Sequence, residues 1–302
     1  MSIVENVISV ENITKRYGEK LLFDPISFGI NKSEKIGVLG INGSGKSTLL
    51  KMLAGIEHQD SGQITFQSNI RIGYLPQSPN LDENLSVIQQ IYMTDHPHFQ
   101  LLNKYYRYSE ALEFDYQEDI FEKQNKVLAE IERNDAWSID YKAKATLTKF
   151  GLNDWQKRIG ELSGGQKRKV DLVRVLLDEP DIILMDEPTN HLDTDIIEYI
   201  QEWMINSKAT ILFVTHDRYF LDAVSTKILE IDQEKIRFYP GSYSAYVERK
   251  QLELVDQERK ETRRQAQLKK ELKWLNRGAR ARATKPKDHV ERVKELIDKS
   301  YL

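Results

Sequence analysis

Residues 40–48 read Gly40-Ile41-Asn42-Gly43-Ser44-Gly45-Lys46-Ser47-Thr48. This stretch fits the phosphate-loop pattern, in which a glycine and four further residues precede Gly-Lys-Ser or Gly-Lys-Thr. The apolar run 36–39 before it predicts a buried strand, and the residues from Thr48 onward predict a helix. Glycines let backbone N–H groups turn inward, and a helix N-terminus adds positive potential. The stretch therefore predicts an α/β fold of the phosphate-loop NTPase class.

The chemistry of a bound nucleoside triphosphate assigns roles to the side chains of this loop. Lys46 is expected to reach the β- and γ-phosphates, and the hydroxyl of Ser47 is expected to bind Mg²⁺. The cofactors that follow are a nucleoside triphosphate, which the family resemblance described below identifies as ATP, and Mg²⁺. The other predicted ATP-binding residues of the loop are Gly40, Asn42, Gly43, Ser44, Gly45 and Thr48.

Two carboxylates follow an apolar run at 182–185, which predicts a buried parallel strand. Asp186 at the strand end is expected to hold Mg²⁺, and Glu187 is expected to act as the base for a water. A second buried strand is predicted over 209–214. It places His216 at the same carboxyl edge, where the imidazole can orient that water and bind the γ-phosphate. These three residues predict hydrolytic chemistry.

Gln77 follows Pro76, which ends a predicted strand at 71–75. Strands over 61–66 and 71–75 are expected to form a hairpin. The amide oxygen of Gln77 can bind Mg²⁺ or the attacking water, although a lone loop glutamine is more often simply solvated. Gln77 is therefore assigned both to the metal site and to catalysis.

Ser163-Gly164-Gly165-Gln166 precedes a predicted helix over 167–177. A Ser-Gly-Gly turn at a helix N-terminus suits an anion, although by itself it can be an ordinary N-cap. Because a phosphate loop occurs in the same chain, phosphate binding is the favoured interpretation of this segment, which we call the signature loop.

The amino-acid composition limits the classes of protein to which the chain can belong. The 302 residues are 40% apolar, include no cysteine and carry a net charge of −3. Without cysteine there is neither a disulfide framework nor a thiolate metal site. The first residues lack the basic and apolar regions of a secretory signal, and no apolar run approaches the roughly 18 residues of a membrane span. We expect a soluble, cytoplasmic protein without membrane insertion.

Shifts in composition predict the domain organisation. A nucleotide-binding domain with a β-rich N-terminal subdomain is expected over 1–85 and 150–240. Aromatic and aliphatic residues at helical spacing predict a helical insert over 86–149. Pro240 and Gly241 mark the start of a basic helical hairpin over 241–302, with a turn near 284–286.

The hairpin concentrates positive charge. Between 259 and 287 there are twelve Lys or Arg and two Glu, a sum of +10, so the rest of the chain sums to −3 − 10 = −13. Dense charge is usually a solvated face, but charge of one sign favours a phosphate backbone. RNA and DNA both remain open as targets. The predicted nucleic-acid contacts are Arg277, Arg280, Arg282, Lys285 and Lys287.

Taken together and in their order along the chain, six features resemble the ABC ATPase domain. They are the phosphate loop, Gln77, the signature loop, residues 182–187, Asn190–Asp193 and His216. In that family two domains meet head to tail around two ATP molecules. The resemblance implies that Tyr17 stacks on adenine. It also implies that Ser163, Gly164 and Gly165 act on the ATP of a second ABC domain, in the same full-length chain or in a homodimer.

Three segments resemble the ABC-F group of this family: residues 186–193, the Tyr239–Ser244 segment and the basic hairpin. Within the hairpin, residues 271–282 are most similar to the Uup-like members of the group. These proteins have two ABC domains joined by a basic linker and no membrane domain. The resemblance implies binding to the ribosome, its rRNA and tRNA, with roles in stalling relief or antibiotic protection. This chain matches half of the group's pattern, so one copy is expected to bind ATP weakly and hydrolyse it poorly.

Two alternatives remain open. The core motifs also fit the ATPase subunit of an ABC transporter, although the basic hairpin and the lack of a membrane segment count against it. A DNA-binding ABC ATPase is the other alternative, because charge alone does not distinguish DNA from RNA.

Overall fold

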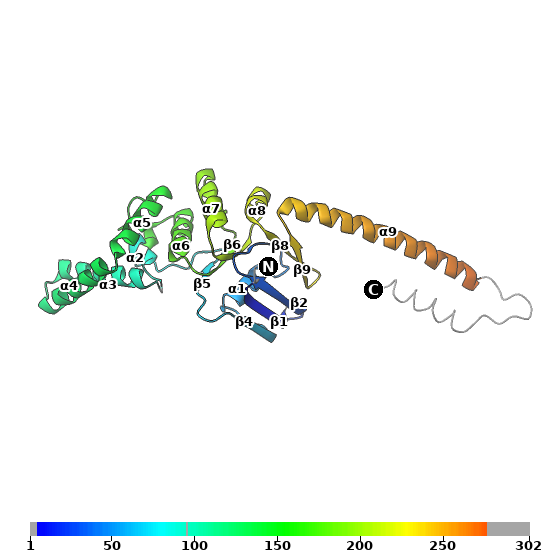
Figure 1. Ribbon diagram of the computed structural model, residues 1–302, viewed down its shortest axis with the longest axis horizontal. Helices are drawn as coiled ribbons and strands as arrows, with labels where there is room; N and C mark the ends of the chain where they lie inside the picture. Colours follow the sequence, from blue (N-terminus) through cyan, green and yellow to red (C-terminus); the bar gives the residue numbers. More distant parts are fainter. Residues whose placement is uncertain (1–4, 95, 277–302) are drawn as a thin grey trace, which may run out of the picture. The chain divides into compact units, whose positions relative to one another are not determined.

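The computed structural model describes residues 5–94 and 96–276, and its centre is a six-stranded sheet (Figure 1). The strand order is β5-β6-β7-β3-β8-β9, in which the first five run parallel and β9 is antiparallel to β8. The strands are β3 Lys35–Gly40, β5 Ile72–Leu75, β6 Ile182–Asp186, β7 Thr210–Val214, β8 Lys227–Asp232 and β9 Lys235–Pro240. The phosphate loop follows β3 at the centre of this sheet.

A second, three-stranded antiparallel sheet has the order β2-β1-β4. It consists of β1 Asn6–Tyr17, β2 Lys20–Asn31 and β4 Ser61–Phe66. Helix α1, Lys46–Leu53, buries Leu49, Leu50, Met52 and Leu53 in a core that both sheets share. This core fixes the helix that begins at the phosphate loop.

The predicted hairpin of 61–66 and 71–75 is wrong. Strand β4 pairs with β1 in the antiparallel sheet, whereas β5 pairs in parallel with β6 in the central sheet. The two runs are close in sequence, but each finds its partners in a different sheet. The fold class, in contrast, is confirmed, including the hairpin of β8 and β9.

Within the described residues, three helices lie on the face of the central sheet opposite to α1 (Figure 1). They are α6 (Gly164–Asp178), α7 (Thr194–Asn206) and α8 (Arg218–Val224). Phe213 of β7 meets Phe220 of α8 edge to face, with ring centroids 5.6 Å apart. Because apolar layers cover both faces, β6 and β7 are buried throughout. Continuous apolar strands of this kind are typical of parallel sheets between two layers.

The segment between β5 and α6 is helical, with α2 Val87–Ile91, α3 Pro97–Phe114, α4 Glu118–Arg133, α5 Ala136–Lys149 and the 3₁₀ turn Ile159–Glu161. Its inner side is aromatic: Tyr92 stacks on Phe99 with centroids 5.7 Å apart, and its hydroxyl donates a hydrogen bond to Asp140. Gly151, at φ +75°, follows the end of α5 in the left-handed conformation that favours glycine at this position.

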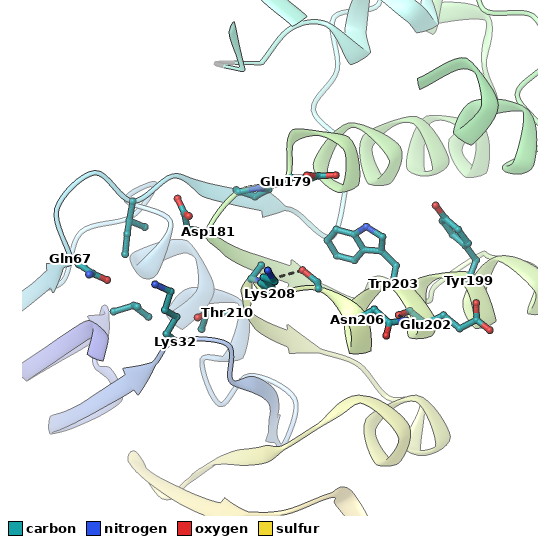
Figure 2. Close-up of a pocket in the computed structure, with 15 residues that line it drawn as sticks. Lys32, Gln67, Glu179, Asp181, Tyr199, Glu202, Trp203, Asn206, Lys208 and Thr210 are labelled. Atoms are coloured by element: carbon teal, nitrogen blue, oxygen red, sulfur yellow. Dashed lines mark hydrogen bonds between the residues drawn. The ribbon is translucent and has the colours of Figure 1, made fainter. Parts of the chain in front are cut away.

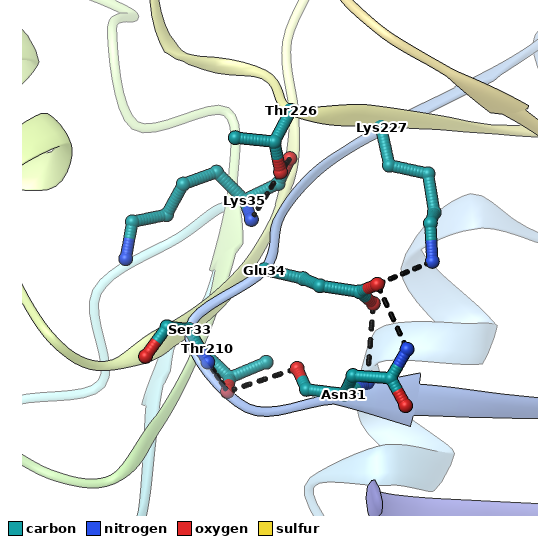
Figure 3. A network of polar contacts seen from close by, with 7 residues as sticks. All are labelled: Asn31, Ser33, Glu34, Lys35, Thr210, Thr226 and Lys227. Atoms are coloured by element: carbon teal, nitrogen blue, oxygen red, sulfur yellow. Dashed lines mark hydrogen bonds and ion pairs between the residues drawn. The ribbon is translucent and has the colours of Figure 1, made fainter. Parts of the chain in front are cut away.

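A polar network anchors the start of β3 (Figure 3). The backbone N–H of Lys35 donates to Thr226 Oγ1 at 3.0 Å, and that of Ser33 donates to Thr210 Oγ1 at 2.9 Å. The Lys35 side chain, 4% exposed, donates to the carbonyls of Ser207, at 2.9 Å, and Ala209. These contacts fix the strand that leads into the phosphate loop.

The chain divides into two compact units, 1–243 and 244–302. Helix α9, Tyr243–Asn276, begins at this boundary and belongs to the second unit from 244 onward, and its side chains from 254 to 267 are exposed. The predicted turn, the second helix and the predicted contacts Arg277, Arg280, Arg282, Lys285 and Lys287 lie outside the described residues. The predicted domain bounds stay a prediction. Over 5–94 and 96–276, no helix is both long and apolar enough to cross a membrane.

Candidate active site

Most of the residues predicted for ATP binding, Mg²⁺ binding and catalysis line one cavity of about 570 Å³ at the carboxyl edge of the central sheet. This places residues from widely separated parts of the sequence together. The predicted residues that line it are Tyr17, Asn42, Gly43, Gly45, Lys46, Ser47, Thr48, Gln77, Asp186, Glu187 and His216. Gly40 and Ser44 belong to the same loop but do not line the cavity.

Two glycines of the phosphate loop have conformations that a side chain would strain. Gly43 and Gly45 have φ of +76° and +100°. A Cβ atom on Gly45 would also lie 2.7 Å from the Phe23 ring. The loop therefore needs glycine here both for its curvature and for its close approach to β2.

Lys46 begins helix α1 and folds back over its own loop. Its Nζ donates to the carbonyls of Gly40 at 2.8 Å and Ile41 at 3.1 Å. Burial lowers the pKa of Lys46, and the charges of Glu187 and Asp186 oppose that effect. The Lys46 ammonium can therefore leave the loop carbonyls and donate its hydrogen bonds to a more strongly charged acceptor, such as a phosphate.

Glu187 is the most unusual acidic residue of the cavity. It is 5% exposed and has a left-handed backbone with φ +55°, a conformation uncommon for a residue with a side chain. Its Oε1 lies 3.4 Å from His216 Nε2, and its buried Oε2 has no hydrogen-bond partner among the described residues. Burial raises the pKa of Glu187. Glu187 also lines the cavity, and a carboxylate oxygen without a hydrogen-bond partner can accept a proton.

Three oxygen donors of the cavity suit a hard cation. Asp186 is 2% exposed at the end of β6, and Ser47 and Gln77 line the same cavity. A hydroxyl, an amide oxygen and one carboxylate form a donor set that Mg²⁺ accepts, because Mg²⁺ takes oxygen ligands and keeps several waters. The residues present therefore fit this ion.

Tyr17 ends β1 and precedes a two-residue turn that contains Gly18 at φ +58°. Its hydroxyl donates to Glu57, and Lys15 Nζ lies 5.3 Å from the ring centroid. The side chain is 50% exposed at the cavity, so one face of the ring is available to a planar ligand.

The signature loop lies elsewhere in the same chain. Ser163 caps α6: its Oγ accepts from the Gln166 N–H at 3.3 Å, and Gln166 Oε1 accepts from the Ser163 N–H at 3.0 Å. Within the described part of the chain, no residue of 163–166 lines the cavity. A Cβ on Gly164 or Gly165 would meet no described atom within 4 Å.

Sequence reasoning assigned no role to three residues at this site. Lys20 and Asn190 line the cavity, and Lys20 Nζ donates to the Gly43 carbonyl at 3.0 Å. Arg168 lies behind it and donates to the carbonyls of Asp186 and Glu187.

A separate cavity of about 640 Å³ lies on another part of the domain (Figure 2). Figure 2 shows Tyr199 and Trp203 of α7 on one side and Lys32 and Gln67 on the other. Among the residues that line it, none belongs to the predicted site.

The geometry of a phosphate loop, a buried glutamate and a capped glycine turn agrees with comparisons to known proteins. A family model described as ABC transporter matches residues 23–190. The chain belongs to the ABC transporter family. A second model with the same description matches residues 229–299, which include the basic segment. ATP hydrolysis is the activity of ABC ATPase domains.

Relatives of the ABC domain match nearly the whole chain. An "uncharacterized ABC transporter ATP-binding protein YfmR" from Bacillus subtilis is 38% identical over 98% of this chain and 47% of the relative. The "energy-dependent translational throttle protein EttA" is 36% identical in Escherichia coli K12 and 33% in Mycobacterium tuberculosis H37Rv, over 91% and 97% of this chain. The chain spans about half the length of these relatives. The resemblance to the ABC-F group is thereby confirmed.

Solved structures of ABC proteins share the fold. The chain matches a structure described as "ATP binding subunit of ABC transporter" with a TM-score of 0.59 at 21% identity, covering 80% of this chain and 98% of that one. It also matches one described as "RNase-L Inhibitor" with a TM-score of 0.55 at 25% identity, covering 80% and 40%.

Proposed function

We propose that this chain is an ABC domain that binds and hydrolyses ATP together with a second ABC domain, in a cytoplasmic protein that acts on the ribosome during translation. The observation that carries the enzymatic part is Glu187, whose buried Oε2 is unpartnered among the described residues beside His216. Relatives described as translational throttle proteins support the ribosomal part.

ATP binding follows from the residues of the cavity. Backbone N–H groups of the loop and Lys46 hold the phosphates, and Tyr17 stacks on the adenine. Ser47, Gln77 and Asp186 hold Mg²⁺, which, when bound, neutralises charge on the phosphate oxygens. Lys46 exchanges its loop carbonyls at 2.8 and 3.1 Å for phosphate oxygens.

Hydrolysis is in-line attack of water on the γ-phosphate. Glu187 accepts the proton of that water, since burial raises its pKa and makes it a better base than a solvated glutamate. His216 and Gln77 orient the water from the neighbouring strand end and loop. The leaving group is ADP, and the proton on Glu187 returns to solvent.

The signature loop acts on the ATP of the second domain. Glycines at the first helical positions of α6 weaken a helix, and in this chain neither has a positive φ or a close neighbour within the described residues. Such glycines make sense where another molecule approaches the backbone. A phosphate at the N-terminus of α6 is that molecule, bound to Ser163, Gly164, Gly165 and Gln166.

The basic segment binds the ribosome. Of the twelve cations between 259 and 287, seven lie in α9, where Arg259, Lys260, Arg263 and Arg264 occur within two turns. Guanidinium groups pair with phosphate through two parallel hydrogen bonds. Phosphates of rRNA or tRNA are the partners we infer for these cations and for Arg277, Arg280, Arg282, Lys285 and Lys287.

The test is co-sedimentation of the Glu187→Gln protein with ribosomes, with and without ATP and over a salt series. We expect ATP-dependent pelleting that weakens with salt, because each neutralised phosphate releases counterions. Glu83→Gln, on the surface beside Lys167, is the matched control and should behave as wild type. ATP-dependent binding to DNA without pelleting would instead favour a DNA-binding ABC ATPase.

A further inference from the structure

Arg168 is a buried cation on helix α6 that contacts two other segments of the site. Its side chain is 3% exposed. Its Nη2 donates to the carbonyls of Asp186 at 2.6 Å and Glu187 at 2.9 Å, and its Nη1 donates to the carbonyl of Pro76. One guanidinium thus joins the signature helix, the end of β6 and the loop after β5.

The three acceptors are backbone groups at the residues proposed for hydrolysis. Pro76 directly precedes Gln77, and the other two carbonyls belong to Asp186 and Glu187 themselves. Hydrogen bonds to carbonyls fix the course of the backbone, while the side chains remain available to ligands. The planar guanidinium presents its donors at fixed angles, so all three carbonyls are fixed relative to one another.

The N-terminus of the same helix carries the signature loop. Arg168 lies five residues, little more than one helical turn, from Ser163. The reciprocal hydrogen bonds between Ser163 and Gln166 hold this first turn in helical geometry. Displacement of the N-terminus of α6 is therefore transmitted to the guanidinium without an intervening loop.

The environment of Arg168 indicates that this residue connects the three segments rather than only stabilising the fold. Its Nε is buried and has no hydrogen-bond partner among the described residues, which is destabilising for a donor. Burial lowers the pKa of Arg168, and the charges of Asp171, Asp186 and Glu187 oppose that effect. The side chain leaves one donor unsatisfied while it bridges three segments.

We propose that Arg168 is a positioning residue that couples the signature loop to Gln77 and Glu187 of the same chain. Contact of Ser163–Gly165 with the ATP of a second domain then sets the backbone geometry of this chain's own hydrolytic residues. Occupancy of one ATP site of the pair therefore changes the geometry of the hydrolytic residues at the other site. This inference rests on the proposed function, because it assumes that the signature loop meets a partner's nucleotide.

The test compares Arg168→Lys with Arg174→Lys. Lysine keeps the positive charge but lacks the planar fork that reaches three carbonyls. Arg174 lies on the same helix, where it donates to Asp171 at 2.7 Å, so the same substitution there controls for a general effect on α6. Thermal melting of both variants shows that they fold. ATP affinity and turnover are measured over a range of protein concentrations.

We expect Arg168→Lys to lower kcat about tenfold, within the range of typical coupling between sites, while ATP affinity stays within about threefold of wild type. A purely structural role would change both together or lower only the melting temperature. Arg174→Lys should leave kcat unchanged. Unchanged kcat in the folded Arg168→Lys protein would overturn the inference.

Hydrogen exchange separates this inference from the proposed function, because it needs no turnover. In the Glu187→Gln background, ATP should protect amides of 163–167, 76–79 and 185–191. Adding Arg168→Lys should retain protection at 163–167 and abolish it at the other two segments. If wild type shows linked protection but no hydrolysis, the proposed enzyme fails and the coupling stands. If all three segments stay protected in the double variant, the coupling fails.

Discussion

Glu187 and His216 stand at the ends of adjacent parallel strands, β6 and β7, with Oε1 of the acid 3.4 Å from Nε2 of the imidazole. The pairing of Asp186 with Val214 brings the two strand ends level, and the Glu187 N–H donates to the Val214 carbonyl at 2.9 Å. The left-handed backbone of Glu187 then directs its side chain into the cavity. Sheet register therefore places the acid beside the imidazole.

Glu187→Gln should stabilise the fold at neutral pH while it abolishes hydrolysis. Burial raises the folded pKa of Glu187, so the folded state binds more protons than the unfolded state as the pH rises above the ordinary glutamate pKa of 4.5. Stability contributed by wild-type Glu187 is therefore lost as pH rises through that window. We expect a gain of about 1 kcal/mol in the free energy of unfolding at pH 7.5, since the cost of burying the negative charge of Glu187 is removed.

Denaturant titrations at pH 7.5 and pH 5 measure this effect. The advantage of Glu187→Gln should diminish at pH 5, where wild-type Glu187 is closer to its neutral form. Glu83→Gln, whose side chain is 70% exposed, is the control and should change stability little at either pH. A variant less stable than wild type at pH 7.5 would contradict the inferred burial cost.

Gly165→Ala and Gly45→Ala should have opposite effects on stability. Gly165 is helical with open space around its Cβ position, so alanine should stabilise the fold by about 0.5–1 kcal/mol. Gly45 has φ +100° and lies against Phe23, so alanine there should destabilise by more than about 1 kcal/mol. Both should reduce hydrolysis, Gly165→Ala by obstructing the partner's phosphate.

Equilibrium unfolding and ATPase assays on the two variants distinguish these effects. Full activity in a stabilised Gly165→Ala protein would show that no ligand approaches the signature loop closely. Loss of stability in that variant would instead place an unexpected neighbour beside the glycine.

The sequence predicted the residues of the cavity better than it predicted strand pairing. The motifs at Lys46, Glu187 and His216 each follow a buried parallel strand, and parallel strand ends necessarily meet at one edge. Residues 61–66 and 71–75 carry no comparable constraint, because partner choice depends on which sheet has a free edge. That is why their predicted hairpin was wrong.

Arg168 and Lys20 show a second limit of sequence reasoning. Their acceptors are backbone carbonyls, which every residue possesses, so no side-chain pattern identifies the partners. The carbonyls that Arg168 contacts lie 92, 18 and 19 residues away in the chain. Only the packing of α6 against β5 and β6 brings them together.

Tyr17→Ala should weaken ATP binding, whereas Tyr17→Phe should not. Stacking of a base on an aromatic ring contributes about 1–3 kcal/mol, and phenylalanine keeps the ring. The Tyr17 hydroxyl contacts Glu57, which already accepts from Lys15 at 3.0 Å, so its loss leaves Glu57 paired. Titration with a fluorescent ATP analogue measures both affinities. Equal weakening in both variants would mean that the hydroxyl, rather than the ring, matters.

Lys35→Met tests the buried ammonium at the base of β3. Burial lowers the pKa of Lys35 from 10.5 to about 8. Between these values the unfolded state binds more protons, so wild-type stability should rise with pH relative to a variant that lacks the amine. The difference in unfolding free energy between wild type and Lys35→Met should therefore move in favour of wild type by about 2 kcal/mol from pH 7 to pH 10.

Lys32→Met is the matched control, because Lys32 lies on the same turn with its side chain 60% exposed in an ion pair with Glu5. The Lys32→Met variant therefore controls for the loss of a lysine and of its positive charge at this end of the sheet. The Lys35 ammonium instead donates to the Ser207 and Ala209 carbonyls beyond the end of α7. If those carbonyls and the helix dipole fully offset its burial, the Lys35→Met difference would be independent of pH, and the lowered pKa would be wrong.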